Sequence, residues 1–157
     1  MTVAERILDL FDAAGCGYRL LDHPPAYDAE QAARLRDTPL SEGGKALVMR
    51  LDRGIGFAVL ALAADRQVDN RALRKHLGVR RYRFATPEEL EAHTGLQPGC
   101  IPPFGEPVLP LPLYVDQDLA AGERIAFTAG SHTLSVVVAT PEWLAVARPT
   151  EVFPFAR

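Results

Sequence analysis

Cysteine is scarce in this 157-residue sequence. Its two cysteines, Cys16 and Cys100, lie in opposite halves of the chain, and neither belongs to a C-x-x-C pair. This arrangement excludes a zinc knuckle and a disulfide framework. We therefore expect two free thiols.

A long hydrophobic run is also lacking. The longest uncharged apolar segment, residues 55–64, is about half of the roughly 20 residues that a spanning helix needs. Charged Glu5 and Arg6 stand where a signal peptide would turn apolar. The hydrophobic content of 48% is enough to close one core. We expect a cytoplasmic protein with no membrane partner that forms a single domain over residues 1–157.

An excess of positive charge is absent as well. A net charge of −3 argues against indiscriminate coating of nucleic acid, because such binding needs surplus cations to displace counterions. Six cations nevertheless fall between Arg71 and Arg83. They form either a solvated helix and strand face or a surface that meets phosphate groups.

Self-contained catalytic signatures are missing too. The sequence has no G-x-S-x-G elbow, no P-loop, no G-x-G-x-x-G turn, no H-E-x-x-H pair and no zinc-deaminase pattern. Chemistry must therefore come from residues that the fold brings together.

The secondary-structure signals that are present alternate between helix and strand. Capping residues predict helices that begin after Thr2, Asp28, Asp69 and Thr86, and a last helix at Thr140. The β-compatible runs are residues 18–22, 45–51, 55–63, 80–84, 114–116, 124–128 and 133–139. We expect a mixed α/β fold in which about five helices surround a central mixed, largely antiparallel sheet or partial barrel.

Lys45 is unusual because the chain has only two lysines against fifteen arginines. It follows Gly43 and Gly44 at the start of a predicted strand. An ammonium among glycine N–H groups can seat an anion. The alternative is a solvent-facing residue at a junction between loop and strand.

Residues 95–105 form a glycine- and proline-rich loop. Glycines let backbone N–H groups approach a ligand, prolines hold them in place, and rigid N–H donors stabilise an oxyanion. A surface crossover is the competing interpretation. Cys100 lies in this loop, but no base that could activate its thiol is close in sequence.

Two of the four histidines lie near predicted strand ends. His132, at a turn, can hydrogen-bond a substrate or move a proton. The adjacent Ser131 faces the opposite side of the strand, so a Ser–His pair is disfavoured. His23 either lines a pocket or ends a strand, and the second interpretation is favoured. His76 and His93 lie on polar helices and are expected at the surface.

Several short motifs together resemble one family, the YbaK and prolyl-tRNA-synthetase insertion-domain group of aminoacyl-tRNA deacylases. The matching residues are L-D-H-P at 21–24, G-G-K-A-L-V at 43–48, A-D-R-Q-V-D at 64–69, T-P-E-E-L at 86–90, T-G-L-Q-P-G at 94–99, P-P-F-G at 102–105, Y-V-D at 114–116, A-G-S-H at 129–132 and T-P at 140–141. They cover nearly the whole chain in the family's order.

This resemblance implies hydrolysis, in trans, of the ester between a wrong amino acid and the terminal adenosine of a tRNA, with no metal or organic cofactor. The implied partner is the aminoacyl-tRNA acceptor end; a partner synthetase and the oligomeric state stay open. The implied catalytic residues are Lys45, His132, Gly130, Gly99, Cys100 and Ile101. The implied substrate-binding residues are His23, Tyr27, Asp28, Gly44, Ala46, Pro102, Phe104 and Ser131.

The expected mechanism needs no protein nucleophile, since an aminoacyl ester is already activated. Loop N–H groups around Gly99 would hold the oxyanion, Lys45 would grip phosphate or ribose, and His132 would position the aminoacyl group or the attacking hydroxyl. Either water or the 2′-hydroxyl attacks.

The sequence departs from the family pattern at 27–28 and at Ala46. The amino acid therefore stays open among alanine, cysteine, serine and threonine. Two other functions compete with deacylation: a non-catalytic module that binds tRNA or a synthetase, and a hydrolase that uses Cys100.

Overall fold

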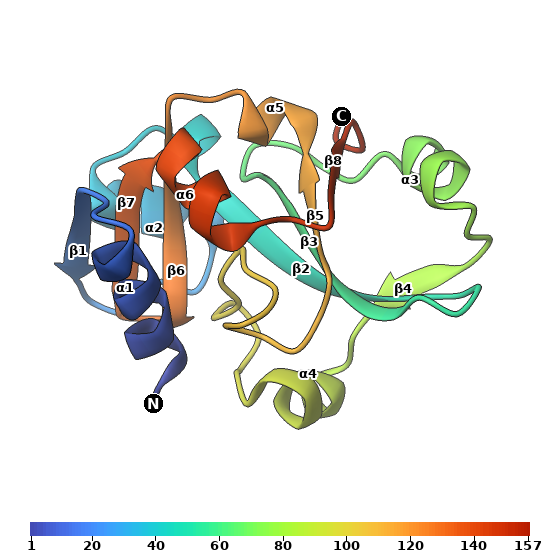
Figure 1. The fold of residues 1–157 in the computed structure, drawn as a ribbon, viewed down its shortest axis with the longest axis horizontal. Helices are drawn as coiled ribbons and strands as arrows, with labels where there is room; N and C mark the ends of the chain where they lie inside the picture. Colours follow the sequence, from blue (N-terminus) through green and yellow to red (C-terminus); the bar gives the residue numbers. More distant parts are fainter.

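The computed structural model describes residues 1–157 and contains two β-sheets (Figure 1). The three-stranded sheet has the order β1 (Tyr18–Asp22), β7 (Leu134–Ala139), β6 (Arg124–Ser131). The five-stranded sheet has the order β4 (Tyr82–Phe84), β2 (Gly44–Leu51), β3 (Gly56–Ala63), β5 (Leu113–Asp116), β8 (Glu151–Phe153). Among the strand pairings, only β3–β5 and β5–β8 are parallel, and an isolated parallel bridge joins Gly43 to Ala126 of β6.

Six α-helices and one 3₁₀ turn complete the fold. They are α1 (Val3–Ala13), α2 (Ala29–Arg36), the turn η1 (Leu40–Glu42), α3 (Asn70–Leu77), α4 (Pro87–Thr94), α5 (Gln117–Ala120) and α6 (Thr140–Ala147). The predicted caps are confirmed, because the side chains of Thr2, Asp28, Asp69 and Thr86 each accept a hydrogen bond from a backbone N–H in the first turn.

The expectation of a mixed, largely antiparallel α/β fold is confirmed, and two details differ. The strands form two open sheets instead of one sheet or partial barrel. The extra elements are α5 and β8. These elements are only four and three residues long, too short to show a helical or strand period. None of the helices has the length and apolarity to cross a bilayer.

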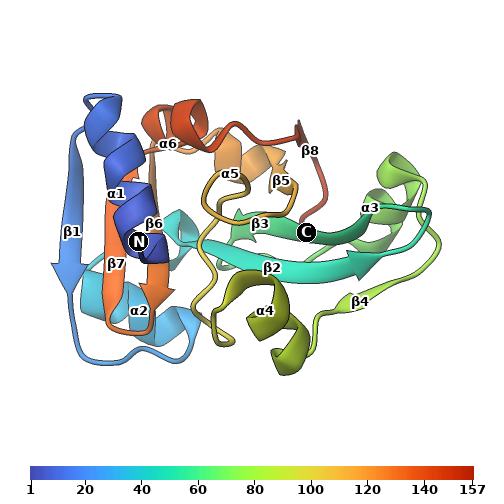
Figure 2. The ribbon, with the colours of Figure 1, turned by 60° about the horizontal axis from the view of Figure 1, so that its bottom comes forward.

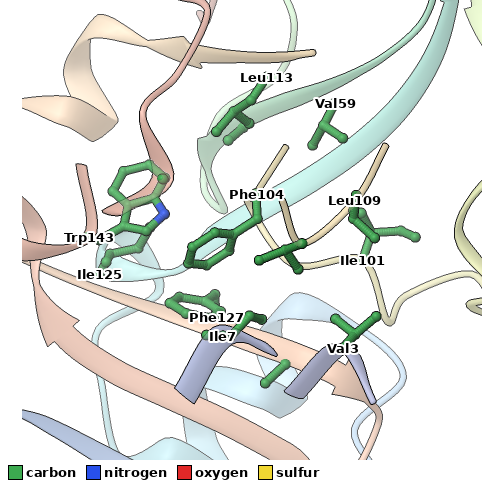
Figure 3. Close-up of a cluster of buried hydrophobic side chains, with 14 of the residues drawn as sticks. Val3, Ile7, Val59, Ile101, Phe104, Leu109, Leu113, Ile125, Phe127 and Trp143 are labelled. Carbon is green, nitrogen blue, oxygen red and sulfur yellow. The ribbon is translucent and has the colours of Figure 1, made fainter. Parts of the chain in front are cut away.

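The main core lies where the two sheets face each other. Residues 95–112, coloured yellow to gold in Figure 1, enter this core through their own side chains. Figure 3 shows Ile101, Phe104 and Leu109 in one buried cluster with Phe127 of β6 and Leu113 of β5, in which the Phe104 and Phe127 rings lie edge to face. Trp143 of α6 donates from Nε1 to the Pro103 carbonyl at 3.0 Å. The loop is thus held rigidly, which is what a backbone binding site requires.

A second, smaller core covers the other face of the five-stranded sheet, on the side where Figure 2 shows α3. Leu73 of α3 packs there against strand residues that include Leu60 and Leu62. The two clusters bury most of β3 on both faces, and β2 pairs with β3 along its whole length, so the start of β2, where Lys45 lies, has a defined position.

Candidate catalytic pocket

A cavity of about 250 Å³ opens between α2, the start of β2 and the tip of the glycine- and proline-rich loop. Five alanines and three glycines are among its fifteen lining residues. The lining consists of Ala26, Tyr27, Asp28, Ala29, Ala32, Arg36, Gly43, Gly44, Lys45, Ala46, Leu47, Ala64, Gly99, Ile101 and Thr128. The small side chains leave room for a ligand, and the few polar groups are the ones that can form hydrogen bonds with it.

Helix α2 contributes one face to this cavity. Ala29, Ala32 and Arg36 follow one another at helical spacing, so all three point to the same side. Asp28 begins the helix by accepting from Gln31 N at 2.8 Å. The carboxylate of Asp28 is therefore occupied as a helix cap at the pocket wall.

Lys45 enters the pocket from the first residues of β2. Its Nζ donates to the Arg66 carbonyl, which fixes the ammonium at the wall. Burial lowers the pKa of Lys45, and the nearby Asp65 carboxylate partly opposes that effect. Gly44 has no room for a side chain, since a Cβ would lie 2.5 Å from Ile125 Cδ1. Lys45 is thus a cation on a backbone that packs tightly between the sheets.

Two loop residues with free N–H groups line the same cavity. Cys100 N is already used, because it donates to Gln97 O at 3.1 Å. The N–H groups of Gly99 and Ile101 make no hydrogen bond within the chain, and both residues line the pocket. Gly99 has φ +83°, a conformation that favours glycine. The two N–H groups are therefore available to a ligand, whereas Cys100 N–H is not.

His132 lies behind the pocket wall and does not line the cavity. Its Nε2 donates to the Pro98 carbonyl at 3.0 Å, since that oxygen only accepts. The ring meets Tyr27 edge to face, with centroids 4.8 Å apart, and a Cβ on Gly99 would lie 3.4 Å from Nε2. The geometry makes His132 a support for two wall residues.

The thiol of Cys100 is enclosed, with the residue 5% exposed. Burial raises the pKa of Cys100, and a hydrogen bond from the backbone of His132 only partly opposes this. The sulfur is therefore protonated near neutral pH. That state is unsuitable for a nucleophile.

The remaining predicted residues lie elsewhere. Gly130 and Ser131 line a different groove, beside the N-terminal end of α1. Phe104 and Pro102 are buried, and the Phe104 ring lies edge to face with Phe127 in the core. His23 follows the last residue of β1, as the favoured interpretation expected, and its side chain stands outside the pocket lining.

Arg36 is the pocket residue that sequence reasoning missed. Only 7% exposed, it donates from Nε to Ser135 Oγ at 2.9 Å and from Nη2 to Thr128 Oγ1 at 3.0 Å. None of the four ion pairs includes it. Burial lowers the pKa of Arg36 to about 10, so it is still a cation at neutral pH. In the sequence it looks like an ordinary cation in the last turn of a helix.

A hydrogen-bonded chain holds Arg36 from behind. Ser135 Oγ also contacts His23 Nε2 at 2.8 Å, and His23 Nδ1 contacts the Pro24 carbonyl at 2.8 Å. Because that carbonyl only accepts, Nδ1 carries a proton. His23 therefore acts on the pocket through Ser135 and Arg36.

A separate group of cations lies at the far end of β2. Arg50, Arg53, Arg74, Arg81 and Arg83 surround a shallow depression at the tip of the β2–β3 hairpin. Three of them belong to the run of cations noted in the sequence, and the hairpin adds the other two. We call these five residues the arginine face.

Comparison with known proteins gives concordant matches. The family model described as "Aminoacyl-tRNA editing domain" matches residues 23–146. The chain is 36% identical to the multifunctional Ser/Thr-tRNA deacylase ProXp-y of Escherichia coli (strain K12), over 98% of this chain and 92% of that protein. It is 28% identical, over 83% of its length, to a segment that makes up 22% of a proline–tRNA ligase from Xanthomonas campestris.

Solved structures share the fold. The crystal structure of a candidate trans-editing enzyme for prolyl tRNA synthetase matches with a TM-score of 0.82 at 24% identity, covering 100% of this chain and 98% of that one. That protein therefore shares the overall fold of this chain.

Proposed function

The chain belongs to the aminoacyl-tRNA editing domain family, and on this premise we propose that it is a trans-editing deacylase that hydrolyses the ester of a mischarged tRNA. One observation carries the proposal. Lys45, Gly99 and Ile101 line one small cavity, and the N–H groups of Gly99 and Ile101 have no partner within the chain. Such a set can hold the negative charge that develops when an ester is attacked.

The size of the cavity supports a small aminoacyl group. Its volume of about 250 Å³ lies below the range of roughly 300–1,000 Å³ that is usual for drug-sized ligands. Alanine, cysteine, serine and threonine esters fit that limit. The Escherichia coli relative is named for serine and threonine, and we propose the same pair for this chain.

The chemistry follows from what each group can do. A water molecule attacks the ester carbonyl carbon, and the N–H groups of Gly99 and Ile101 stabilise the oxyanion. The bond to the ribose 3′-oxygen then breaks, and that oxygen takes a proton as the free amino acid leaves. Attack by the 2′-hydroxyl would only move the acyl group between two ribose oxygens, so release requires water.

Lys45 and His132 take different roles in this scheme. Lys45 lines the cavity and attracts the negative charge of the terminal nucleotide or of the oxyanion. His132 is a positioning residue, because it supports Tyr27 and fixes the loop through Pro98 without lining the cavity.

The arginine face fits the tRNA acceptor end as a partner. β2 joins it to the pocket, and seven residue steps from Gly44 to Leu51 at about 3.3 Å each give roughly 23 Å. Cations at that distance can meet the phosphodiester backbone while the terminal ester enters the pocket.

Single-turnover deacylation by Lys45→Ala tests the proposal. We expect the rate to fall about 100-fold or more, as is usual for loss of one charge-stabilising group. Lys75→Ala is the matched control, because Lys75 is the only other lysine and is exposed on α3.

Two outcomes would contradict the proposal. A Lys45→Ala rate within a few fold of wild type would remove the role of Lys45. Wild-type protein that retains mischarged tRNA without releasing any amino acid would instead identify the non-catalytic binding module.

A further inference from the structure

We propose that Arg36 determines specificity, by donating a hydrogen bond from its guanidinium to the side-chain hydroxyl of the aminoacyl group. This inference rests on the proposed function and goes beyond it, because it names the residue that would make the pocket prefer seryl and threonyl esters to alanyl and cysteinyl esters.

One nitrogen of Arg36 is left over for a ligand. Nε and Nη2 are bound to the hydroxyls of Ser135 and Thr128, whereas Nη1 makes no hydrogen bond within the chain. Two side-chain polar atoms are fully enclosed and have no partner, and these are Thr38 Oγ1 and Thr140 Oγ1. Nη1 of Arg36 also has no partner but is not among them, so part of its surface is accessible. Arg36 lines the cavity, and a Cβ built on Gly43, another lining residue, would lie 3.9 Å from Nη1, so we infer that the open side faces the ligand space.

The chemistry of a guanidinium limits what this group can be. All its N–H groups donate and none accepts, so its partner must be an acceptor. An aminoacyl ester carries no free carboxylate, and its α-ammonium is repelled by Arg36. A methyl group accepts nothing and a thiol accepts only weakly, whereas a hydroxyl accepts well. The side-chain oxygen of serine or threonine is thus the best match.

The surroundings of Arg36 make the discrimination strong. Size alone separates small apolar side chains poorly, but a site built to bond a hydroxyl disfavours an analogue that lacks it. Here an alanyl ester would leave a buried, charged donor without a partner. No carboxylate competes for the guanidinium, and Ser135, itself fully buried, fixes its direction.

The place proposed for the substrate's side-chain hydroxyl is consistent with the place proposed for its ester carbonyl. Thr128, whose Oγ1 accepts from Arg36, lines the cavity together with Gly99 and Ile101. An ester carbonyl at the free N–H groups can therefore place its side chain toward Arg36 and Thr128. The Thr128 hydroxyl keeps its own proton to donate, so the pocket offers one charged and one neutral donor.

The test compares seryl and alanyl esters on one tRNA body. Wild type should release serine with a kcat/KM at least about tenfold higher than alanine. Arg36→Met should reduce that serine-to-alanine ratio at least tenfold, by slowing serine release more than alanine release. Arg34→Met is the matched control, because Arg34 is exposed on the same helix, and it should leave the ratio unchanged.

A purely structural role for Arg36 would give a different result. Both rates would then fall together, and the unchanged ratio would overturn the proposal; equal wild-type rates for serine and alanine would also overturn it. Wild type that releases neither amino acid would contradict the proposed function instead.

The affinity of the unmodified protein for substrate analogues tests the role of Arg36 independently. This measurement does not require the Arg36 variant to fold or the ester to be hydrolysed. The probes are 3′-amide-linked seryl-adenosine and alanyl-adenosine. We expect at least about tenfold tighter binding of the seryl amide and a shift of the Arg36 Nε–H NMR signal with that compound alone. Equal affinities would overturn the assignment.

Discussion

The molecule carries positive charge in two contrasting places. In the pocket, Arg36 is buried, bonds only to neutral hydroxyls and has no carboxylate beside it. On the arginine face, the residues are exposed, and one of the side chains has a carboxylate partner. Arg83 there pairs with Glu89 at 2.7 Å, and that contact is the main reason why the pKa of Glu89 is lowered to about 2.

The difference separates two tasks that one kind of side chain can perform. An exposed guanidinium is screened by salt and attracts any phosphate backbone, so it contributes affinity without choice. A buried guanidinium cannot remain unbonded without cost, so it discriminates between ligands that do and do not satisfy it. Affinity for tRNA and choice of amino acid should therefore respond to different mutations.

A substitution that fills the pocket should separate the deacylation rate from the affinity for tRNA most completely. Ala32→Leu places a larger side chain on the wall of α2, and we expect deacylation to fall about 100-fold because the ester is displaced from the N–H groups. The affinity for tRNA, measured by filter binding, should stay within about twofold because the arginine face is untouched.

Arg34→Leu, at an exposed position of the same helix, is the control for Ala32→Leu and should keep wild-type rates. If Ala32→Leu abolished tRNA binding and deacylation in parallel, the pocket and the arginine face would be a single site. The separation of tasks would then be wrong.

Neutralising the arginine face should have the opposite pattern. Arg53→Asn combined with Arg81→Gln is expected to raise KM about tenfold at low salt and to leave the saturated single-turnover rate unchanged. Asparagine suits position 53 because Arg53 has φ +60°. The slope of log KM against log salt should lessen by about 0.9 for each phosphate group that the variant no longer neutralises.

Arg19→Gln removes one charge on β1, in the other sheet, and should change neither KM nor the salt slope. A double variant with an unaltered salt slope would show that the arginine face does not meet phosphate groups. The pattern of cations would then be only a solvated surface.

The smallest effect should be a shift in pH dependence. The carboxylate of Asp65 raises the pKa of Lys45, whereas burial lowers it below its ordinary value of 10.5. Asp65→Asn removes the raising contribution, so Lys45 should lose its proton at lower pH. The alkaline fall in deacylation rate, corrected for spontaneous ester hydrolysis, should move to lower pH.

Asp9→Asn, on the exposed side of α1, is the control and should leave the alkaline limb in place. Both variants act on the same ester, so titration of its α-ammonium cancels in the comparison. A shift of the limb to higher pH with Asp65→Asn would contradict the assigned sign.

Local signals allowed most of the fold to be predicted from the sequence. Caps such as Asp28 and Thr86 act within one turn of a helix, and the β2–β3 hairpin is encoded by two adjacent runs and one turn. The existence of two sheets was missed because the pairing of β1 with β7 joins residues more than a hundred positions apart.

The pocket was only partly predictable for the same physical reason. The loop and Lys45 were identified, but which loop N–H groups are free depends on the turn that takes up Cys100 N. Arg36 became visible only when its partners Thr128 and Ser135 were placed beside it by β6 and β7. No spacing in the sequence could have shown that this cation lacks a carboxylate.

The hydrogen bond from Lys45 to the Arg66 carbonyl has a consequence for the chain during its synthesis. The Arg66 carbonyl that receives the Lys45 ammonium lies in a turn whose next residue, Gln67, exchanges two backbone hydrogen bonds with Arg157, at 2.8 and 3.0 Å. Buried Asp116 holds the same segment by accepting from Phe155 N. A chain still emerging from the ribosome has Lys45 long before it has residues 155–157. We therefore expect a nascent chain to be inactive as a deacylase. Its own synthesis uses aminoacyl-tRNA, which it would then leave intact.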